Sequence, residues 1–285
     1  MIQSMTGYGK SLVQLPSKKI TVEIKSLNSK NLDVNARVPS AYREKELDIR
    51  KRISKSLSRG KVDFNLYVEQ TGEETSTVIN EAAVKQYMKQ LAHITDGNPV
   101  ELMKMAVRFP DALQTERDEI DETEYNKIIE AVDEALQSIN QYRTDEGKAL
   151  EADFQKRITN ISTLLDEVMK LDPQRMDNVK ERLAKAVSDL KETVDENRFE
   201  QELVYYLEKY DITEEQVRLS NHLSYFSETL QSKTSNGKKL GFISQEIGRE
   251  INTIGSKANF APMQQVVVQM KDELEKIKEQ ALNVL

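Results

Sequence analysis

The residues best suited to chemistry lie near the carboxyl end of the chain, in the stretch 237–259 (GKKLGFISQEIGREINTIGSKAN). If this stretch is a helix, Glu246 and Glu250 lie on one flank, one turn apart, with Lys257 further along it. Two carboxylates at this spacing can chelate a divalent cation or share general acid and base work. The same spacing is also typical of ordinary helix ion pairs, so both interpretations stay open.

The opposite polar side of this stretch carries Arg249 and Asn252, together with an unusual number of small residues. Gly241, Gly248 and Gly255 would each cost about 1 kcal/mol relative to alanine inside a helix. Such glycines are typical of places where another backbone or a ligand comes close.

Histidine occurs only twice, as His93 and His222. His93 ends an amphipathic segment, where a surface position near a helix terminus is expected. His222 lies beside an apolar stripe and could be a half-buried hydrogen-bonded residue, a metal ligand or a proton carrier. Carboxylates surround it in the sequence, at Glu200, Glu202, Asp211, Glu214 and Glu215. A carboxylate-rich cluster with one histidine, facing a helix with Lys, Arg and Asn, suits phosphate-ester chemistry.

Several function classes are excluded by what the sequence lacks. The chain has no cysteine, which rules out thiol catalysis, disulfides and zinc fingers. There is no Walker loop, no Gly-x-Gly-x-x-Gly after a strand and no Gly-x-Ser-x-Gly elbow. Nucleotide-driven, dinucleotide and serine-hydrolase chemistry are therefore not expected.

Length and charge indicate the number of domains, the expected location of the protein and a basic region that could bind a ligand. The 285 residues suggest about two domains, and neither a membrane-spanning stretch nor a signal peptide is recognisable, so a cytoplasmic protein without membrane contact is expected. The net charge of −7 divides unevenly, because residues 1–70 carry +7 and the remainder −14. The basic part could bind phosphate or be a solvated surface.

The patterning predicts an α+β protein: an N-terminal β-rich domain with short helices, then long antiparallel helices and a helical C-terminal domain. Alternation predicts strands at 19–25 and 62–68, with a further strand starting at 5–9, and helical spacing predicts a helix over 42–57. We assign 1–120 to the first domain, 121–200 to a long helical hairpin arm, and 201–285 to the helical domain with the candidate metal cluster. The first domain contains the basic part of the chain, which becomes a candidate RNA groove only through the family resemblance described below.

Three details of the helical part follow from local signals. Asp172-Pro173 is expected to break the helix that starts near Thr123 and to begin the return half of the hairpin. Thr213 with Gln216 predicts a capping box. Heptad stripes predict packing faces. They consist of Leu219, Leu223, Phe226 and Leu230; of Leu240, Ile243, Ile247, Ile251 and Ile254; and of Met263, Val267, Met270, Leu274, Ile277, Ala281 and Val284.

A series of short motifs resembles the bacterial YicC/YloC endoribonuclease family, in the same order and at similar spacing from residue 4 to the last helix. In the first half they are SMTGYG at 4–9, KSLN at 25–28, LSRGKV at 57–62, FPD at 109–111 and EGKAL at 146–150. In the second half they are NRFEQE at 197–202, DITEE at 211–215, RLSNHL at 218–223, GKKLGF at 237–242 and most of 245–259.

The resemblance implies a stress-linked protein of RNA turnover or small-RNA regulation that cleaves single-stranded RNA, depends on a divalent metal and assembles as a hexamer. By position, it assigns catalytic work to His222, Glu246, Arg249, Glu250, Asn252 and Lys257. It places metal ligands at Glu202, His222, Glu246 and Glu250, with Asp211 and Glu215 as weaker candidates. Candidates for the RNA path are Arg59, Lys61, Lys238 and Lys239.

One departure affects RNA binding. Relatives commonly continue an early motif with a histidine, an arginine and an aromatic residue, whereas this chain has Ser29, Lys30 and Asn31 in the corresponding segment. The missing ring removes a stacking platform, so strong base stacking by this segment is not expected.

These residues lead to one mechanism with open points. Mn²⁺ or Mg²⁺ would neutralise the phosphate, Arg249 and Lys257 would bind it, and the attacker would be either a metal-activated water or the neighbouring 2′-hydroxyl. Two alternatives remain. The chain could be an RNA-binding adaptor without cleavage, or an oligomeric helical scaffold whose polar cluster is only a salt-bridge network.

Overall fold

The computed structural model describes residues 2–71, 77–115, 121–189, 196–232 and 234–285. The chain divides into two compact units. The helical unit comprises Met1–Gly7, Ser26–Asn31 and Asn140–Leu285, and the sheet unit comprises Tyr8–Lys25 and Leu32–Ile139. The long helix α4 contributes its first turns to the sheet unit and the rest to the helical unit.

The elements confirm the α+β class. In chain order they are β1 (Gly7–Gln14), β2 (Lys18–Leu27), β3 (Leu32–Arg37), the 3₁₀ helix η1 (Ser40–Lys45), α1 (Glu46–Ser56), β4 (Gly60–Gln70), β5 (Thr77–Ile79), α2 (Glu81–Ile94), α3 (Pro99–Ala106), β6 (Leu113–Thr115), α4 (Glu122–Asp189), α5 (Glu196–Tyr210), α6 (Thr213–Leu230), α7 (Gly237–Lys257) and α8 (Ala261–Ala281).

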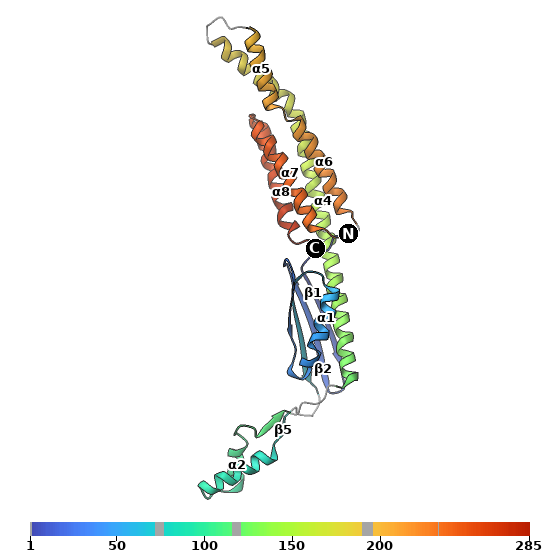
Figure 1. Ribbon diagram of the computed structural model, residues 1–285, viewed down its shortest axis with the longest axis vertical. Coiled ribbons are helices and arrows are strands. Elements are labelled where there is room, and N and C mark those ends of the chain that lie inside the picture. The colour runs from blue at the N-terminus through green and yellow to red at the C-terminus, as the bar shows by residue number, and fades with distance from the viewer. Residues whose placement is uncertain (1, 72–76, 116–120, 190–195, 233) are drawn as a thin grey trace. The chain divides into compact units, whose positions relative to one another are not determined.

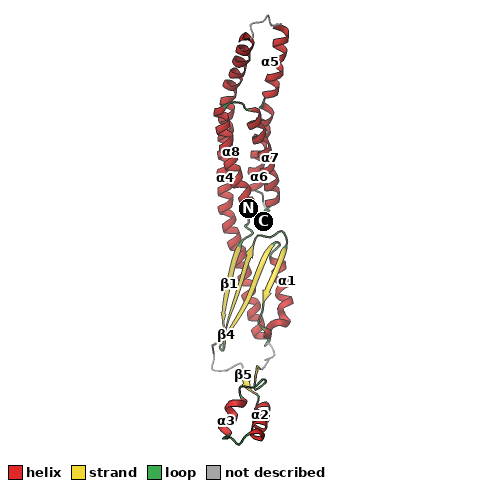
Figure 2. Cartoon of the chain, turned by 90° about the vertical axis from the view of Figure 1, so that its left-hand side faces the viewer, coloured by secondary structure: helices red, strands yellow, loops and turns green. Residues whose placement is uncertain are grey.

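The sheet unit is built on strands in the order β1-β2-β4-β3 (Figure 2). The two strands predicted from alternation are confirmed as β2 and β4, and the predicted early strand is β1. β3 was missed, although Leu32, Val34 and Ala36 alternate with polar residues in the same way as in β2 and β4. It pairs parallel to β4, with Leu32 opposite Gly60 and Arg37 opposite Asn65.

One face of this sheet carries the core of the unit, and α1 and the first turns of α4 cover it (Figure 1). Ile20 and Val22 of β2 pack here with Ile49 and Ile53 of α1. At Gly9, a Cβ atom would lie 2.1 Å from the carbonyl oxygen of Ala135, so only glycine allows this close approach of β1 and α4.

A smaller group of elements lies between 77 and 115. β5 and β6 pair antiparallel, and α2 and α3 pack around Val84, Ala106 and Ala112. The Asn80 side chain caps α2 by accepting a hydrogen bond from the Ala83 backbone N–H at 3.1 Å. α3 begins at Pro99, where the missing backbone donor costs nothing.

The predicted break at Asp172-Pro173 is wrong, because α4 runs without interruption from Glu122 to Asp189. Proline removes one backbone donor and costs about 3 kcal/mol inside a helix. Buried side chains before and after it, Val168 and Val179, offset this cost by keeping both halves packed. The hairpin therefore does not turn at Pro173, and residues 190–195 lie outside the described part.

The core of the helical unit lies between α6, α7, α8 and the part of α4 from Phe154 to Val168 (Figure 1). All three predicted stripes are confirmed, since every one of their members is buried there. Among the described helices, none has an apolar stretch long enough to cross a membrane.

Candidate functional site

Three of the predicted residues meet where α6 begins and α7 ends. The Lys257 ammonium donates to Glu215 Oε1 at 2.8 Å and to the backbone oxygen of Asp211 at 2.8 Å. Asp211 Oδ1 in turn accepts from the Thr213 hydroxyl at 2.7 Å and its backbone N–H at 2.9 Å. These two bonds hold the pKa of the Asp211 carboxyl below its ordinary value, with a smaller contribution from the charge of Lys257.

The capping box predicted at Thr213 is wrong. Thr213 is the first helical residue of α6, and the preceding Ile212, which cannot cap with its side chain, takes the cap position. Asp211 supplies the acceptor instead, through an Asx-type turn. The Gln216 side chain is buried, and its Nε2 has no hydrogen-bond partner among the described residues.

This meeting point is largely buried. Glu215 is 6% exposed, and its second oxygen, Oε2, has no hydrogen-bond partner in the described part of the chain. Arg175 from α4 is 1% exposed, donates from Nε to Asp172 Oδ1 at 2.8 Å and reaches the Lys257 carbonyl at 3.5 Å. The charges of this buried network are therefore paired within the protein.

Arg175 was missed because the helix was expected to break two residues before it. The spacing of Asp172 and Arg175 is itself a helical signal, since ion pairs three residues apart require a continuous turn. The Asp172–Arg175 pair therefore indicates that α4 continues past Pro173, whereas the proline alone indicates a break.

The middle of α7 presents its charges differently. The Glu246 carboxylate and the Arg249 guanidinium lie 3.9 Å apart, and the two side chains are 50% and 74% exposed. Glu250, one turn after Glu246, is 5% exposed. No hydrogen bond or ion pair of the Glu250 carboxylate occurs among the described residues. The two predicted carboxylates thus share a flank but not an environment.

His222 is half-buried on α6. Two contacts join α6 to α7: Lys257 meets Glu215, and the Lys239 ammonium lies 4.5 Å from the Tyr225 ring centroid. The two helices therefore run antiparallel, and positions 222 and 246 both lie between these contacts.

The remaining predicted residues are spread over other elements. Asn252 is exposed on α7, and Glu202 is exposed on α5. Lys238 starts α7 with its ammonium 5.9 Å from the Phe242 ring centroid. Arg59 and Lys61 flank the start of β4 in the sheet unit, where Gly60 has a φ of 126°, a value that glycine adopts readily. Gly60 is the first residue of β4, and α1 ends before it at Ser56.

The four-residue metal site does not form within one chain. Over the described ranges, no three His, Asp or Glu side chains are arranged to hold an ion. Mg²⁺ and similar ions are often held by only one or two carboxylates, with phosphate oxygens and waters completing the shell. Glu246 and Glu250 fit that smaller donor set, because they lie one turn apart on one helix.

Comparison with known proteins agrees with the motif resemblance along the whole chain. A family model described as "Endoribonuclease YicC-like, N-terminal region" matches residues 2–152, and one described as "Endoribonuclease YicC-like, C-terminal" matches 168–285. A Clostridioides difficile protein named "Probable endoribonuclease YicC" is 32% identical over 293 residues, covering all of both chains. A Haemophilus influenzae protein of the same name is 27% identical over 287 residues, again over the full length of both.

Proposed function

The chain belongs to the YicC-like endoribonuclease family, and from this premise we propose that it cleaves single-stranded RNA at internal phosphodiester bonds. A role in RNA turnover or small-RNA regulation in the cytoplasm, linked to stress, follows the same resemblance. The observation that carries the proposal is the flank of α7 with Glu246 and Glu250, one carboxylate solvated and the other buried.

Two carboxylates in unlike environments can divide acid and base work between them. Glu246 is half exposed and open to an incoming strand. His222 on the neighbouring helix α6 can take up or release a proton near neutral pH. Arg249 has a solvated guanidinium that can bind the scissile phosphate and stabilise the charge that develops on it.

Lys257 fits a different role from Arg249. Its ammonium is bound by Glu215 and by the Asp211 backbone, so binding a phosphate would require breaking both hydrogen bonds. We assign it to positioning the end of α7 against the start of α6. Asn252 is exposed on the same polar side as Arg249 and remains a candidate for contact with the RNA.

We also propose that cleavage requires a divalent metal, Mn²⁺ or Mg²⁺. Glu246 and Glu250 would hold it, with His222 favouring Mn²⁺, and it would supply neutralisation of the phosphate charge. Assembly into a hexamer is likewise a proposal from the resemblance, to be measured by sedimentation equilibrium.

The test uses a fluorogenic single-stranded RNA and the purified full-length chain, with Mn²⁺, with Mg²⁺ and with EDTA. We expect cleavage that EDTA abolishes and that the variant E246Q/E250Q loses. The matched control is E275Q/E279Q, which removes the same charge at the same spacing on α8. Analysis of the product ends distinguishes attack by water from attack by the 2′-hydroxyl.

Cleavage by E246Q/E250Q at the rate of the control would overturn the assigned site. RNA binding without any products from the unaltered protein would overturn cleavage itself and favour the adaptor. Neither binding nor cleavage would favour the scaffold.

A further inference from the structure

The face of the sheet turned away from α1 is open within the sheet unit. Along β4, Val62, Phe64 and Leu66 are buried against the helices, so the alternate residues project from the other face. Tyr67 is one of these, and 49% of it is exposed.

The register places an arginine beside this tyrosine. The Asn35 side chain donates to Asp63 Oδ1 at 2.9 Å, so neighbouring side chains of β3 and β4 touch across the open face. Two residues further along each strand, Arg37 stands opposite Asn65, and Tyr67 is the next outward residue of β4. Arg37 and Tyr67 are therefore diagonal neighbours, at a separation that long side chains bridge.

A cavity of about 410 Å³ opens where β3 ends and η1 follows. Its lining consists of Ala36, Arg37, Val38, Pro39, Arg43, Glu46 and Leu66. Within the described part of the chain, neither the Arg37 nor the Arg43 guanidinium has a hydrogen bond or an ion pair. The acid in the lining, Glu46, is bound by Arg50 Nε at 2.7 Å. Two spare guanidinium groups at one cavity suit a compact anion such as phosphate.

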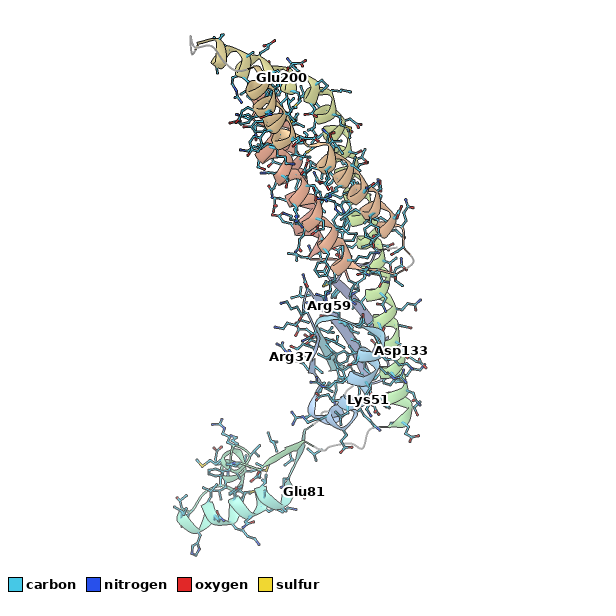
Figure 3. The ribbon with its side chains drawn as sticks, turned by 45° about the horizontal axis from the view of Figure 1, so that its top comes forward. Arg37, Lys51, Arg59, Glu81, Asp133 and Glu200 are labelled. Carbon is cyan, nitrogen blue, oxygen red and sulfur yellow. The ribbon has the colours of Figure 1, made fainter. Side chains whose placement is uncertain are left out.

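We propose that this cavity and Tyr67 bind one nucleotide of a single-stranded RNA, an inference that rests on the proposed function. Arg37 and Arg43 bind the phosphate, and Tyr67 stacks on the adjoining base. The stacking platform absent at 29–31 is thereby supplied from another strand. Arg59 lies at the opposite end of the β3–β4 pair (Figure 3), about 20 Å away for six residues at 3.3 Å each. The strand pair thus carries cationic groups at both ends.

The experiment measures binding alone, using a fluorescein-labelled single-stranded RNA of twelve nucleotides in EDTA across a series of salt concentrations. Each lost phosphate contact lowers the slope of log K against log salt by about 0.7 for single strands. We expect R37Q/R43Q to lower it by about 0.7, because both arginines bind the same phosphate, and to weaken binding at every salt concentration. Tyr67→Leu should weaken binding about 5- to 100-fold with the slope unchanged, and Tyr67→Phe should restore it.

The matched control is K51Q/K55Q, which removes two exposed charges from α1, on the covered side of the sheet (Figure 3). An equal change of slope in R37Q/R43Q and in this control would overturn the proposal. It would also be overturned if R37Q/R43Q changed the sedimenting mass and left RNA affinity intact, since the face would then join copies of the chain. Failure of cleavage by the unaltered protein refutes the nuclease but leaves this binding result readable, because binding is measured without metal.

Discussion

At the last turn of α7, Lys257 is bound by Glu215 and by the backbone of Asp211. In the middle of the same helix, Glu246 and Arg249 lie 3.9 Å apart in solvent, and each is the other's ion-pair partner among the described residues. Both places carry acids and bases from the same series of motifs. At the last turn the charges are paired in a largely buried contact, and in the middle they are accessible to solvent. Residue type therefore does not separate a positioning group from a reactive one, but the partners of each group do.

The largest expected effect is a loss of catalytic rate, and it tests the charges in the middle of α7. Replacing Arg249 by Gln removes the charge proposed to stabilise the reacting phosphate, so kcat should fall about 10²- to 10³-fold. The free energy of unfolding should change by less than about 0.5 kcal/mol, because exposed ion pairs contribute little. Single-turnover cleavage and urea denaturation measure the two quantities, with Arg182→Gln on an exposed part of α4 as the control. Equal rates for the two variants would remove Arg249 from the site.

The next largest effect is a loss of stability, and it tests the contacts of Lys257 at the last turn of α7. Lys257→Met leaves the buried Glu215 carboxylate without its partner, so the unfolding free energy should fall by about 2–3 kcal/mol. Adding Glu215→Gln should recover part of that loss, because the buried charge is then removed as well. Urea denaturation at pH 7 measures both. A Lys257→Met variant that keeps its stability but loses RNA affinity would show that the ammonium serves the substrate instead.

A smaller effect concerns Asp211. Asp211→Ala removes the acceptor for Thr213 and should cost about 1 kcal/mol, while Asp211→Asn keeps an acceptor and should cost less. Because the folded pKa is lowered from 3.8, the charged form contributes stability that is present above the unfolded value. It is lost as the pH falls through the folded value. The stability difference between the unaltered protein and Asp211→Asn should therefore shrink below pH 3.8, and a constant difference down to pH 2 would contradict this assignment.

The spacing of apolar residues was sufficient to predict the strands β2 and β4 and every buried stripe of α6, α7 and α8. An element that is buried on one side repeats its apolar residues at its own structural period. Features that depend on contacts with residues distant in the sequence could not be predicted in this way. The cost of Pro173 is local, but what offsets it is packing on either side of the proline along α4. The cap of α6 was assigned to Thr213, but Thr213 is the first helical residue, and its own N–H and hydroxyl donate to Asp211 two residues earlier.

The same reason limits the site. The sequence could place Glu246 and Glu250 on one flank, because both lie on one helix, but not their unequal exposure, which depends on the helices packed around them. It could not join Lys257 to Glu215 either, since that contact spans 42 residues. The four-ligand metal set combined residues of α5, α6 and α7, and such a set needs tertiary distances that spacing does not contain.

The smallest effect distinguishes the glycines of α7. A Cβ on Gly255 would lie 3.0 Å from Val267 Cγ1 and one on Gly248 3.1 Å from Leu274 Cδ2, so both are explained by the close approach of α8. A Cβ on Gly241 meets no atom within 4 Å. Gly241→Ala should therefore stabilise the protein by about 0.4–1 kcal/mol, because alanine favours the helix. If RNA affinity falls while stability rises, something outside the chain comes close to Gly241; if both stay at or above their original values, the glycine serves neither packing nor binding.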